Sequence, residues 1–379
     1  MIIGIDASNI RFGGGITHLR ELLAGVDRDV CSFDRVIVWG GKKTLDQLPD
    51  KEWLVKQHIP LLDGNLLKRL FWQKKLLTKY AKKSCDILFV PGANYSGSYR
   101  PYVSMSQNLL PFDYKERARF GFSWTHLRYR LLELSQKKSF INANGVIFLT
   151  NTAQNVVESS TGKLPVASSI VPHGVLSVFL QKPREQKDIS EYTKDNPFKL
   201  LYVSNINYYK HQWVVIEAIS RLRERGVPVS LDLVGPAYTS ALSKLNDSIQ
   251  KFDPDGDFVN FKGSVSYSSL PDIYKNSDAF VFASSCENLP NILLEAMASG
   301  LPIACSDSGP MPEVLGECGV YFNPEDAKQI EKSLYKLISD KKLRKKYAEL
   351  AYNESLKYNW PRCAEQTFSF ISEVYNEVR

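Results

Sequence analysis

The segment 278–304 constrains the fold of this chain most, because it has the pattern of a strand, a loop, a helix and a second strand. An apolar run at 278–283 is followed by a polar loop that ends at Pro290. Proline suits the first turn of a helix, because its missing N–H would have no partner there. Gly300 is a typical C-terminal residue of a helix, and the run 301–304 begins the next strand. The pattern predicts a βαβ unit, whose loop at the carboxyl end of a strand is a usual place for a ligand.

Two glutamates frame the start of the expected helix. Glu287 precedes it and Glu295 lies on its second turn. Carboxylates accept hydrogen bonds from sugar hydroxyls, and the free N–H groups of a helix start attract phosphate. The unit therefore fits a ligand that carries both a diol and a diphosphate. Two surface glutamates would have the same spacing, so the spacing alone leaves both interpretations open.

The residues around the glutamates add a family resemblance. The run 287–303 has the pattern E-x-L-P-x-x-L-L-E-A-M-A-S-G-L-P-I. This pattern closely resembles the donor-site signature of the retaining glycosyltransferases of family 4. The resemblance implies the GT-B fold, which consists of two Rossmann-like α/β domains with parallel sheets that face a central cleft. It also implies an enzyme of the kind that builds bacterial surface polysaccharides.

Length and composition agree with two globular domains. A chain of 379 residues is longer than a typical single domain, and its apolar share of 44% is ordinary for a soluble protein. No run approaches the ~20 apolar residues of a membrane-spanning helix. The start of the chain lacks the basic segment of a signal peptide. The six cysteines form no CxxC pair, which favours a reducing compartment and argues against a zinc site. We therefore expect a cytoplasmic protein.

The domain boundaries follow from the alternation of short apolar runs with helical patterns, which predicts parallel sheets covered on both faces. We expect a first domain at 1–176 and a second at 198–360. Residues 177–197 show little periodicity and are predicted to be a linker. The resemblance assigns the acceptor to the first domain and the nucleotide sugar to the second. It also implies that a last helix, 361–379, crosses back onto the first domain.

A glycine-rich turn, Arg11-Phe12-Gly13-Gly14-Gly15, lies between the first strand and the first helix. Glycines let the backbone approach a phosphate or a sugar closely. The turn is not a GxGxxG fingerprint, which argues against a dinucleotide site, and a flexible loop remains an alternative. The resemblance implies that Gly14 and Gly15 contact the donor, and that Arg11 and Gly13 contact the acceptor.

Two further positions of the first domain gain a role from the resemblance. Gln107 stands where many family members have a histidine that reaches the donor sugar. Glutamine can hydrogen-bond a hydroxyl, but it cannot carry a positive charge. The run Val-Pro-His-Gly-Val at 171–175 resembles a strand-end signature of the family, which implies that His173 lines the acceptor side. A structural turn is the alternative at His173.

In the second domain, Lys210 matches the family lysine that holds the donor diphosphate. Its ammonium group would neutralise the charge that grows on the leaving phosphate. The arginine common a few residues upstream is replaced by Ser204 and Asn205. The expected catalytic residues are thus Glu287, Lys210 and Gln107. The expected donor site comprises Gly14, Gly15, Ser204, Asn205, Lys210, Val265 near the base, Asn288, Leu289, Pro290, Asn291, Ile292 and Glu295.

The resemblance implies retaining transfer of a sugar from a nucleoside-diphosphate donor, which is a co-substrate, with no cofactor and no divalent metal. Two alternatives stay open. One is a transferase that acts on a small soluble acceptor. The other is a non-catalytic subunit that binds a sugar nucleotide, which the glutamine at position 107 leaves open.

Two basic segments with interleaved aromatic and aliphatic residues, 65–83 and 115–138, lie in the first domain. Such segments fit an anionic membrane surface, and solvated helix faces are the alternative. No recognised motif accompanies the charge, so we do not expect a nucleic-acid partner. We expect a saccharide acceptor linked to polyprenyl diphosphate, in the synthesis of O-antigen, capsule or exopolysaccharide. The enzyme would then be peripheral on the cytoplasmic face of the inner membrane.

Overall fold

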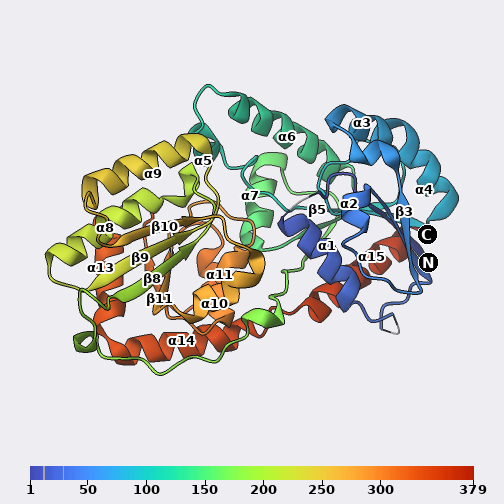
Figure 1. Ribbon diagram of the computed structural model, residues 1–379. Helices are drawn as coiled ribbons and strands as arrows, with labels where there is room; N and C mark the ends of the chain where they lie inside the picture. Colours follow the sequence, from blue (N-terminus) through green and yellow to red (C-terminus); the bar gives the residue numbers. More distant parts are fainter. Residues whose placement is uncertain (12, 29) are drawn as a thin grey trace. The chain divides into compact units, whose positions relative to one another are not determined.

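The computed structural model describes residues 1–11, 13–28 and 30–379, which form two compact units (Figure 1). The first unit comprises residues 1–174 and 359–379, and the second comprises residues 175–358. Each unit is built on one parallel sheet. Within the described residues, we find no helix with the length and apolar character that crossing a bilayer requires.

The first unit contains a seven-stranded sheet in the order β3-β2-β1-β4-β5-β6-β7. Its strands are β1 (Ile2–Asp6), β2 (Arg35–Gly40), β3 (Leu54–His58), β4 (Ile87–Val90), β5 (Tyr102–Met105), β6 (Gly145–Phe148) and β7 (Ala167–Ile170). Its helices are α1 (Gly14–Gly25), α2 (Lys42–Leu45), α3 (Leu66–Phe71), α4 (Thr78–Ser84), α5 (Tyr114–Ala118), α6 (Trp124–Ile141), α7 (Asn151–Thr161) and α15 (Trp360–Val378). A π-helical turn, η2 (Trp72–Leu77), joins α3 to α4.

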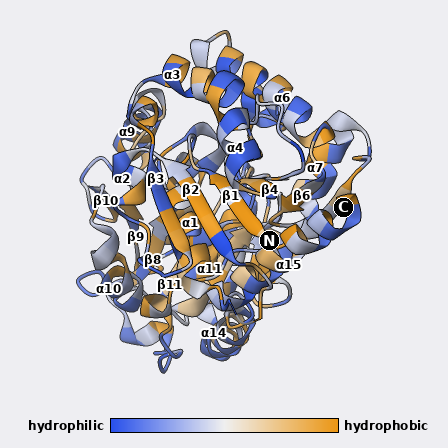
Figure 2. Cartoon of the chain, turned by 90° about the vertical axis from the view of Figure 1, so that its right-hand side faces the viewer, coloured by the Kyte–Doolittle hydropathy of each residue, from blue (hydrophilic) through white to orange (hydrophobic). Residues whose placement is uncertain are grey.

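The core of the first unit lies on both faces of this sheet. Side chains of the central strands such as Ile5, Val38 and Phe89 are fully buried, and apolar colour dominates β1 and β2 in Figure 2. The last helix, α15, packs against β6, where a Cβ atom on Gly145 would lie 2.7 Å from Val374 Cγ2. Glycine at position 145 therefore lets this helix approach the sheet.

The second unit contains a six-stranded sheet in the order β10-β9-β8-β11-β12-β13. Its strands are β8 (Phe198–Val203), β9 (Val229–Val234), β10 (Val259–Gly263), β11 (Ala279–Phe282), β12 (Ile303–Ser306) and β13 (Val320–Phe322). Its helices are α8 (Gln212–Glu224), α9 (Thr239–Phe252), α10 (Leu270–Lys275), α11 (Asn291–Ala298), α12 (Met311–Leu315), α13 (Ala327–Ser339) and α14 (Lys341–Ser355). Two short 3₁₀ turns, η5 (Tyr208–Lys210) and η6 (Tyr267–Ser269), precede α8 and α10.

The segment 177–197, which the sequence predicts to be a linker, is part of the second unit. The backbone N–H of Gln181 donates to the carbonyl of Ala298 at 2.9 Å. Arg184 Nη2 and the Tyr192 hydroxyl donate to Asp278 Oδ1 at 2.5 and 2.8 Å. Apart from two 3₁₀ turns, η3 (Ser177–Phe179) and η4 (Ile189–Glu191), the segment is irregular. It is held by these polar contacts and by the buried ring of Phe179, and such single contacts leave no periodic pattern of apolar residues.

Each sheet has a topological switch point, where the strand order reverses and the loops on the two sides diverge. It lies between β1 and β4 in the first unit and between β8 and β11 in the second. In open parallel sheets, ligands bind outside the carboxyl ends of the strands at such points. The loops after these four strands are therefore where each unit is expected to hold a ligand.

Candidate functional site

The switch point of the second unit holds an ion pair between the buried Lys210 and the half-buried Glu287. Lys210 ends η5 in the loop after β8, and Glu287 lies in the loop after β11. Lys210 is only 3% exposed, and its Nζ atom pairs with Glu287 Oε1. The Ser284 hydroxyl donates to the same carboxylate oxygen at 2.6 Å. Two residues that the sequence singles out separately thus meet in space.

A buried tyrosine fixes the backbone beneath this pair. The Tyr202 hydroxyl donates to the carbonyl of Lys210 at 2.5 Å and accepts from the backbone N–H of Ala283 at 3.2 Å. The Lys210 ammonium lies 5.1 and 5.0 Å from the ring centroids of Tyr209 and Phe282. The two loops are therefore tied together, and the cation is held over aromatic faces.

Helix α11 starts directly after the Glu287 loop. Pro290 is the residue before the helix, and no side chain caps its first turn. Asn288, Leu289 and Pro290 are buried, whereas Asn291 and Ile292 are half-buried. Backbone N–H groups at an uncapped helix start attract anions, so this element and the Lys210 ammonium offer two kinds of phosphate ligand. Pro290 itself supplies no donor.

Glu295, on α11, is buried between two tyrosines. The Tyr267 hydroxyl donates to Glu295 Oε1 at 2.9 Å, and the Tyr274 hydroxyl donates to Oε2 at 3.2 Å. Burial raises the pKa of Glu295 to about 7, although both hydrogen bonds oppose this rise. Each carboxylate oxygen keeps a second lone pair, so Glu295 retains the capacity to accept from a diol.

The other donor-site candidates of this unit lie on the same or neighbouring loops. Ser204 is buried and donates to the carbonyl of Asn205 at 3.1 Å, so both residues shape the turn that leads to Lys210. Val265 is half-buried and precedes Tyr267 by two residues, next to the Glu295 cluster. Their contact with a donor remains a prediction.

In the first unit, Gln107 contacts a buried histidine that the sequence analysis missed. Gln107 Nε2 and His18 Nδ1 are 3.2 Å apart. A Cβ atom on Gly15 would lie 3.4 Å from Gln107 Oε1. The rings of His18 and His173 stack with centroids 4.5 Å apart. His18 therefore links Gln107 to His173, and Gly15 lies next to Gln107.

The charge state of this cluster follows from its burial. Loss of solvent, and then the neighbouring His173, hold the pKa of His18 well below its usual value. The His173 ring also stacks on Trp360 of α15, with centroids 5.6 Å apart. His173 therefore packs the last helix against the first unit, which supports the structural alternative for that residue. A neutral His18 contributes hydrogen-bonding capacity and no charge to the cluster.

The glycine turn begins helix α1 as predicted. Gly13 precedes the helix with a φ of 62°, a conformation that glycine adopts at little cost, and Gly14 is the first helical residue. Arg11 Nη1 donates to the carbonyl of Gly64 at 3.1 Å. Phe12, which belongs to the predicted turn, lies outside the described residues.

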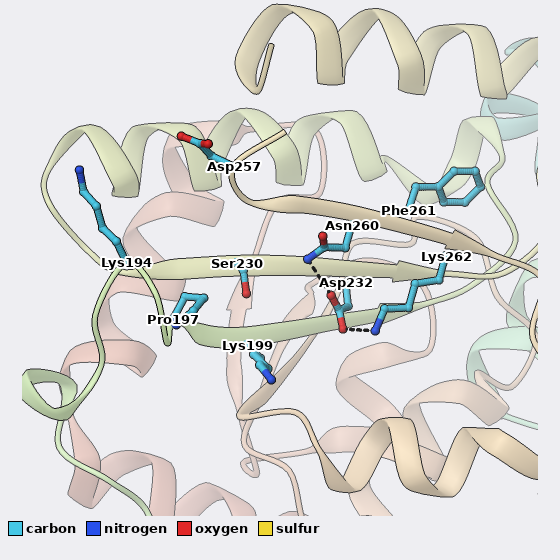
Figure 3. A pocket seen from close by; sticks show the side chains of 9 residues that line it. All are labelled: Lys194, Pro197, Lys199, Ser230, Asp232, Asp257, Asn260, Phe261 and Lys262. Carbon is cyan, nitrogen blue, oxygen red and sulfur yellow. Dashed lines mark hydrogen bonds and ion pairs between the residues drawn. The ribbon is translucent and has the colours of Figure 1, made fainter. Parts of the chain in front are cut away.

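A pocket of about 780 Å³ lies elsewhere on the second unit (Figure 3). Asp232 accepts hydrogen bonds there from Lys262 at 2.5 Å and from Asn260 at 3.1 Å, so these charges are paired within the pocket. We assign no function to this pocket, because its lining contains none of the predicted residues and comes mainly from strand bodies and strand starts. The lining residues are Lys194, Pro197, Lys199, Ser230, Asp232, Asp257, Asn260, Phe261 and Lys262.

Several residues that shape these clusters carry no sequence signal. His18 stands among the apolar residues of α1, and Tyr202 and Tyr274 read as ordinary core aromatics. Ser284 is one of several small polar residues after a strand. Among these residues, only Tyr267 has a neighbour with a predicted role. It lies two residues after Val265, which the resemblance places near the nucleotide base.

Two parallel α/β sheets, each with polar residues gathered at its switch point, define the GT-B class of folds. The crystal structure of Anabaena HepE in complex with UDP has this arrangement. It matches the present chain with a TM-score of 0.69 and 18% sequence identity, over 98% of this chain and 99% of that one. The predicted GT-B fold is confirmed.

Sequence comparisons find similarity to known glycosyltransferases over part of the chain. Residues 183–354 match the family model of glycosyl transferases group 1. A sulfoquinovosyl transferase of Arabidopsis thaliana is 30% identical over 152 residues, which are 36% of this chain and 29% of the relative. An O-antigen chain mannosyltransferase B of Escherichia coli is 28% identical over 112 residues, 30% of this chain and 29% of the relative. The matches thus span less than a third of these two relatives, and the segment that matches the family model lies within the second unit.

Proposed function

We propose that this protein is a retaining glycosyltransferase that moves a sugar from a nucleoside-diphosphate donor to a saccharide acceptor. The observation that carries the proposal is the pair between the buried Lys210 and the half-buried Glu287 at the switch point of the second unit. It lies within the segment that matches the family model. The HepE structure contains UDP, which supports a nucleotide sugar as the donor.

In the proposed reaction, the bond between the sugar C1 and the donor diphosphate oxygen breaks. A bond from C1 to an acceptor hydroxyl oxygen forms on the same face, and the hydroxyl proton passes to the leaving diphosphate. Lys210 and the N–H groups of α11 stabilise the negative charge that grows on the leaving group. Glu287 and Asn291 orient the sugar hydroxyls, and Glu295 accepts from the ribose diol. No metal takes part in this scheme, because Lys210 supplies the cation.

The first experiment measures donor hydrolysis without an acceptor. UDP-, GDP- and dTDP-sugars are incubated with wild type, Glu287→Ala and Lys210→Ala, and free nucleoside diphosphate is measured. Lys262→Ala is the matched control, because it removes a lysine paired with a carboxylate in the same unit, outside the proposed site. We expect slow release from one donor, lost in the first two variants and kept in the control. Release that both site variants retain would refute the assignment.

Stereochemistry and metal dependence are tested on the same reaction. The anomeric configuration of the first product, followed by proton NMR, should equal that of the donor. Activity should be unchanged in EDTA. Inverted product would contradict retention, and loss of activity in EDTA that Mg²⁺ restores would contradict the scheme without metal.

For the acceptor, we propose a saccharide linked to polyprenyl diphosphate, in cell-surface glycan synthesis on the cytoplasmic face of the inner membrane. The Escherichia coli relative named as an O-antigen chain mannosyltransferase supports this choice. A small soluble acceptor is the alternative within the same reaction. Transfer to a lipid-linked saccharide but not to its free sugar would separate the two.

The proposed membrane surface is a row of exposed apolar residues on α6. Figure 2 shows that hydrophobic and hydrophilic residues alternate along this helix. Trp124 is 74% exposed, and Leu127, Leu131 and Leu134 follow it at helical spacing, also exposed. Four basic residues share this helix: Arg128, Arg130, Lys137 and Lys138. Exposed apolar residues beside cations fit the interface of an anionic bilayer.

Helix α3 adds a second element to this surface. Leu66 and Leu67 on it are exposed, as is Phe71 at its end. Both α3 and α6 lie along the upper edge of the first unit in Figures 1 and 2. The two helices can therefore face one membrane.

Vesicle flotation tests this proposal. Wild type should float with vesicles that contain anionic lipid and should not float with phosphatidylcholine alone. The double variant Trp124→Ser/Leu131→Ser should lose flotation, whereas Leu350→Ser, an exposed leucine of the second unit, should keep it. Equal flotation of all three proteins would refute the role of α6.

The non-catalytic alternative rests on Gln107, which cannot carry the charge of the family histidine. Its hydrogen-bond contact with the neutral His18 leaves a reactive role for a cation at this position unsupported. A protein that binds a nucleoside diphosphate in calorimetry, yet turns over no donor with any acceptor, would favour this alternative.

A further inference from the structure

The switch point of the first unit has two arginines on the loops around it. Arg11 lies in the loop after β1, and Arg69 lies on α3. Asn9, in the same loop as Arg11, contacts Asn94 in the loop after β4, with Asn9 Nδ2 3.5 Å from the Asn94 carbonyl. The loops of both switch-point strands therefore meet beside these arginines, where a ligand of an open parallel sheet is expected.

Each arginine reaches the segment that carries the other. Arg69 Nη1 donates to Asn9 Oδ1 at 3.3 Å, and Arg11 Nη1 donates to the carbonyl of Gly64, directly before α3 begins. Arg69 Nε is buried, and no described residue accepts a hydrogen bond from it. A buried guanidinium N–H without a partner costs free energy, which an incoming acceptor atom would recover.

The carboxylates near the two arginines already have partners. Asp63, which interacts with Arg11, accepts from His58 Nε2 at 2.6 Å and from the backbone N–H of Lys42 at 2.7 Å. Burial and the adjacent charge of Arg11 lower the pKa of Arg69. Two cations thus lie close together at a partly desolvated place, which favours a bound anion.

A buried polar network holds this site in shape. Asp6, at the end of β1, accepts from Trp72 Nε1 at 3.2 Å and from Gln73 Nε2 at 2.7 Å. Gln73 Nε2 also lies 2.9 Å from the carbonyl of Asn94. Trp72 and Gln73 belong to the π-helical turn η2 that follows α3, and such turns are frequent at functional sites. The network ties α3 and both switch-point loops into one frame before any ligand binds.

We propose that Arg11 and Arg69 form a binding site for a phosphate or diphosphate group of the acceptor. The planar, always charged guanidinium is suited to bidentate contact with phosphate oxygens. The inference rests on the proposed transferase function and adds which residues hold the phosphate of the acceptor. Leu66 and Leu67 are exposed at the start of the same helix that carries Arg69, so a phosphate attached to a lipid chain fits the surroundings.

The experiment titrates inorganic pyrophosphate into full-length protein by calorimetry. Every protein also carries Lys210→Ala, so that the lysine of the second unit contributes no binding. Arg69→Gln and Arg11→Gln remove one charge each, and Lys82→Gln removes an exposed charge on α4 as a control. Asn9→Ala removes the hydrogen bond of Arg69 to the protein and keeps both cations. Thermal unfolding is recorded for each variant.

We expect pyrophosphate binding to weaken about tenfold or more in Arg69→Gln and Arg11→Gln. It should change by less than about twofold in Asn9→Ala and Lys82→Gln. Arg69→Lys should bind pyrophosphate better than Arg69→Gln but less tightly than Arg69, since lysine keeps the positive charge and lacks the planar guanidinium that makes bidentate contacts. If Arg69→Gln and Asn9→Ala lower the unfolding temperature equally and leave pyrophosphate binding intact, the arginines only anchor α3 and the proposal is wrong.

Acceptor kinetics with intact Lys210 identify the source of the phosphate. Arg69→Gln should raise the KM for a lipid-diphosphate saccharide if the phosphate is the lipid's, and for a soluble sugar phosphate if the acceptor is soluble. If the wild type turns over no donor and Arg69→Gln still loses pyrophosphate binding, the transferase proposal fails and the anion site stands. Equal KM values in wild type and Arg69→Gln for every acceptor would overturn the site.

Discussion

Glu295 gives the sharpest test of the electrostatics, because its burial predicts a stability that falls as pH rises. The carboxyl group is buried between the hydroxyls of Tyr267 and Tyr274, and its pKa is raised from 4.5 to about 7. The folded state therefore holds this proton more tightly than the unfolded state. Between pH 4.5 and 7 the unfolded chain loses the proton first, so ionisation costs the folded state free energy.

The size of the effect follows from the two pKa values. Each tenfold change in proton affinity corresponds to about 1.4 kcal/mol, so a rise from 4.5 to about 7 costs about 3 kcal/mol at pH 8. Glu295→Gln removes the ionisable group and keeps an oxygen that accepts from a tyrosine. We expect the variant to be more stable than wild type by up to about 3 kcal/mol at pH 8, and to show little difference at pH 4.5.

Urea unfolding of both proteins from pH 4.5 to 8 measures this difference. The free energy of unfolding is compared between the two proteins at each pH, because the titration of His18 changes the stability of both proteins in the opposite direction to Glu295. The lowered pKa of His18 makes the folded state lose stability as pH falls, in both proteins alike. A difference that is constant with pH would refute the assignment of a raised pKa to Glu295.

Three further variants test the packing around the proposed sites. Lys210→Met should cost about 1–3 kcal/mol in urea unfolding, because the half-buried Glu287 loses its cation, and adding Glu287→Gln should recover part of the loss; no recovery would contradict the pairing. Tyr202→Phe should cost about 1–3 kcal/mol, because the Lys210 carbonyl and the Ala283 N–H lose their shared hydroxyl; a neutral change would contradict that bridge. Gly174→Ala should cost about 1–3 kcal/mol by calorimetry, since its Cβ would lie 2.3 Å from the backbone nitrogen of Trp360; an unchanged unfolding temperature would contradict this close packing.

The sheets were predictable from the sequence because their strands are short apolar runs bounded by polar turns. The predicted run 278–283 contains β11 (Ala279–Phe282), and the predicted run 301–304 overlaps the start of β12 (Ile303–Ser306). The strap at 177–197 was not predictable as part of the second unit. It is held by single polar contacts such as Arg184 to Asp278, which are 94 positions apart in the chain and leave no local pattern.

For the site, the sequence supplied residues with a recognisable motif, and the fold supplied their partners. Lys210 and Glu287 were found on separate loops, and the reversal of strand order between β8 and β11 brings them together. His18 and Arg69 could not be found in this way. A histidine among core residues and an arginine within a basic segment gain meaning only from what they contact, namely Gln107 and Asn9.

The ion pair also bears on how a donor would bind, since Lys210 is neutralised by Glu287 before any donor arrives. A diphosphate must then compete with a carboxylate for the same ammonium group. Glu287→Gln removes the competing charge, so it should tighten the binding of the free nucleoside diphosphate by about tenfold, or about 1.4 kcal/mol. The same variant should lose transfer, because the carboxylate that orients the sugar is gone. Calorimetry with the nucleoside diphosphate, run beside the donor hydrolysis assay, separates the two effects. Weaker binding in Glu287→Gln would mean that Glu287 supports the diphosphate site and does not compete with it.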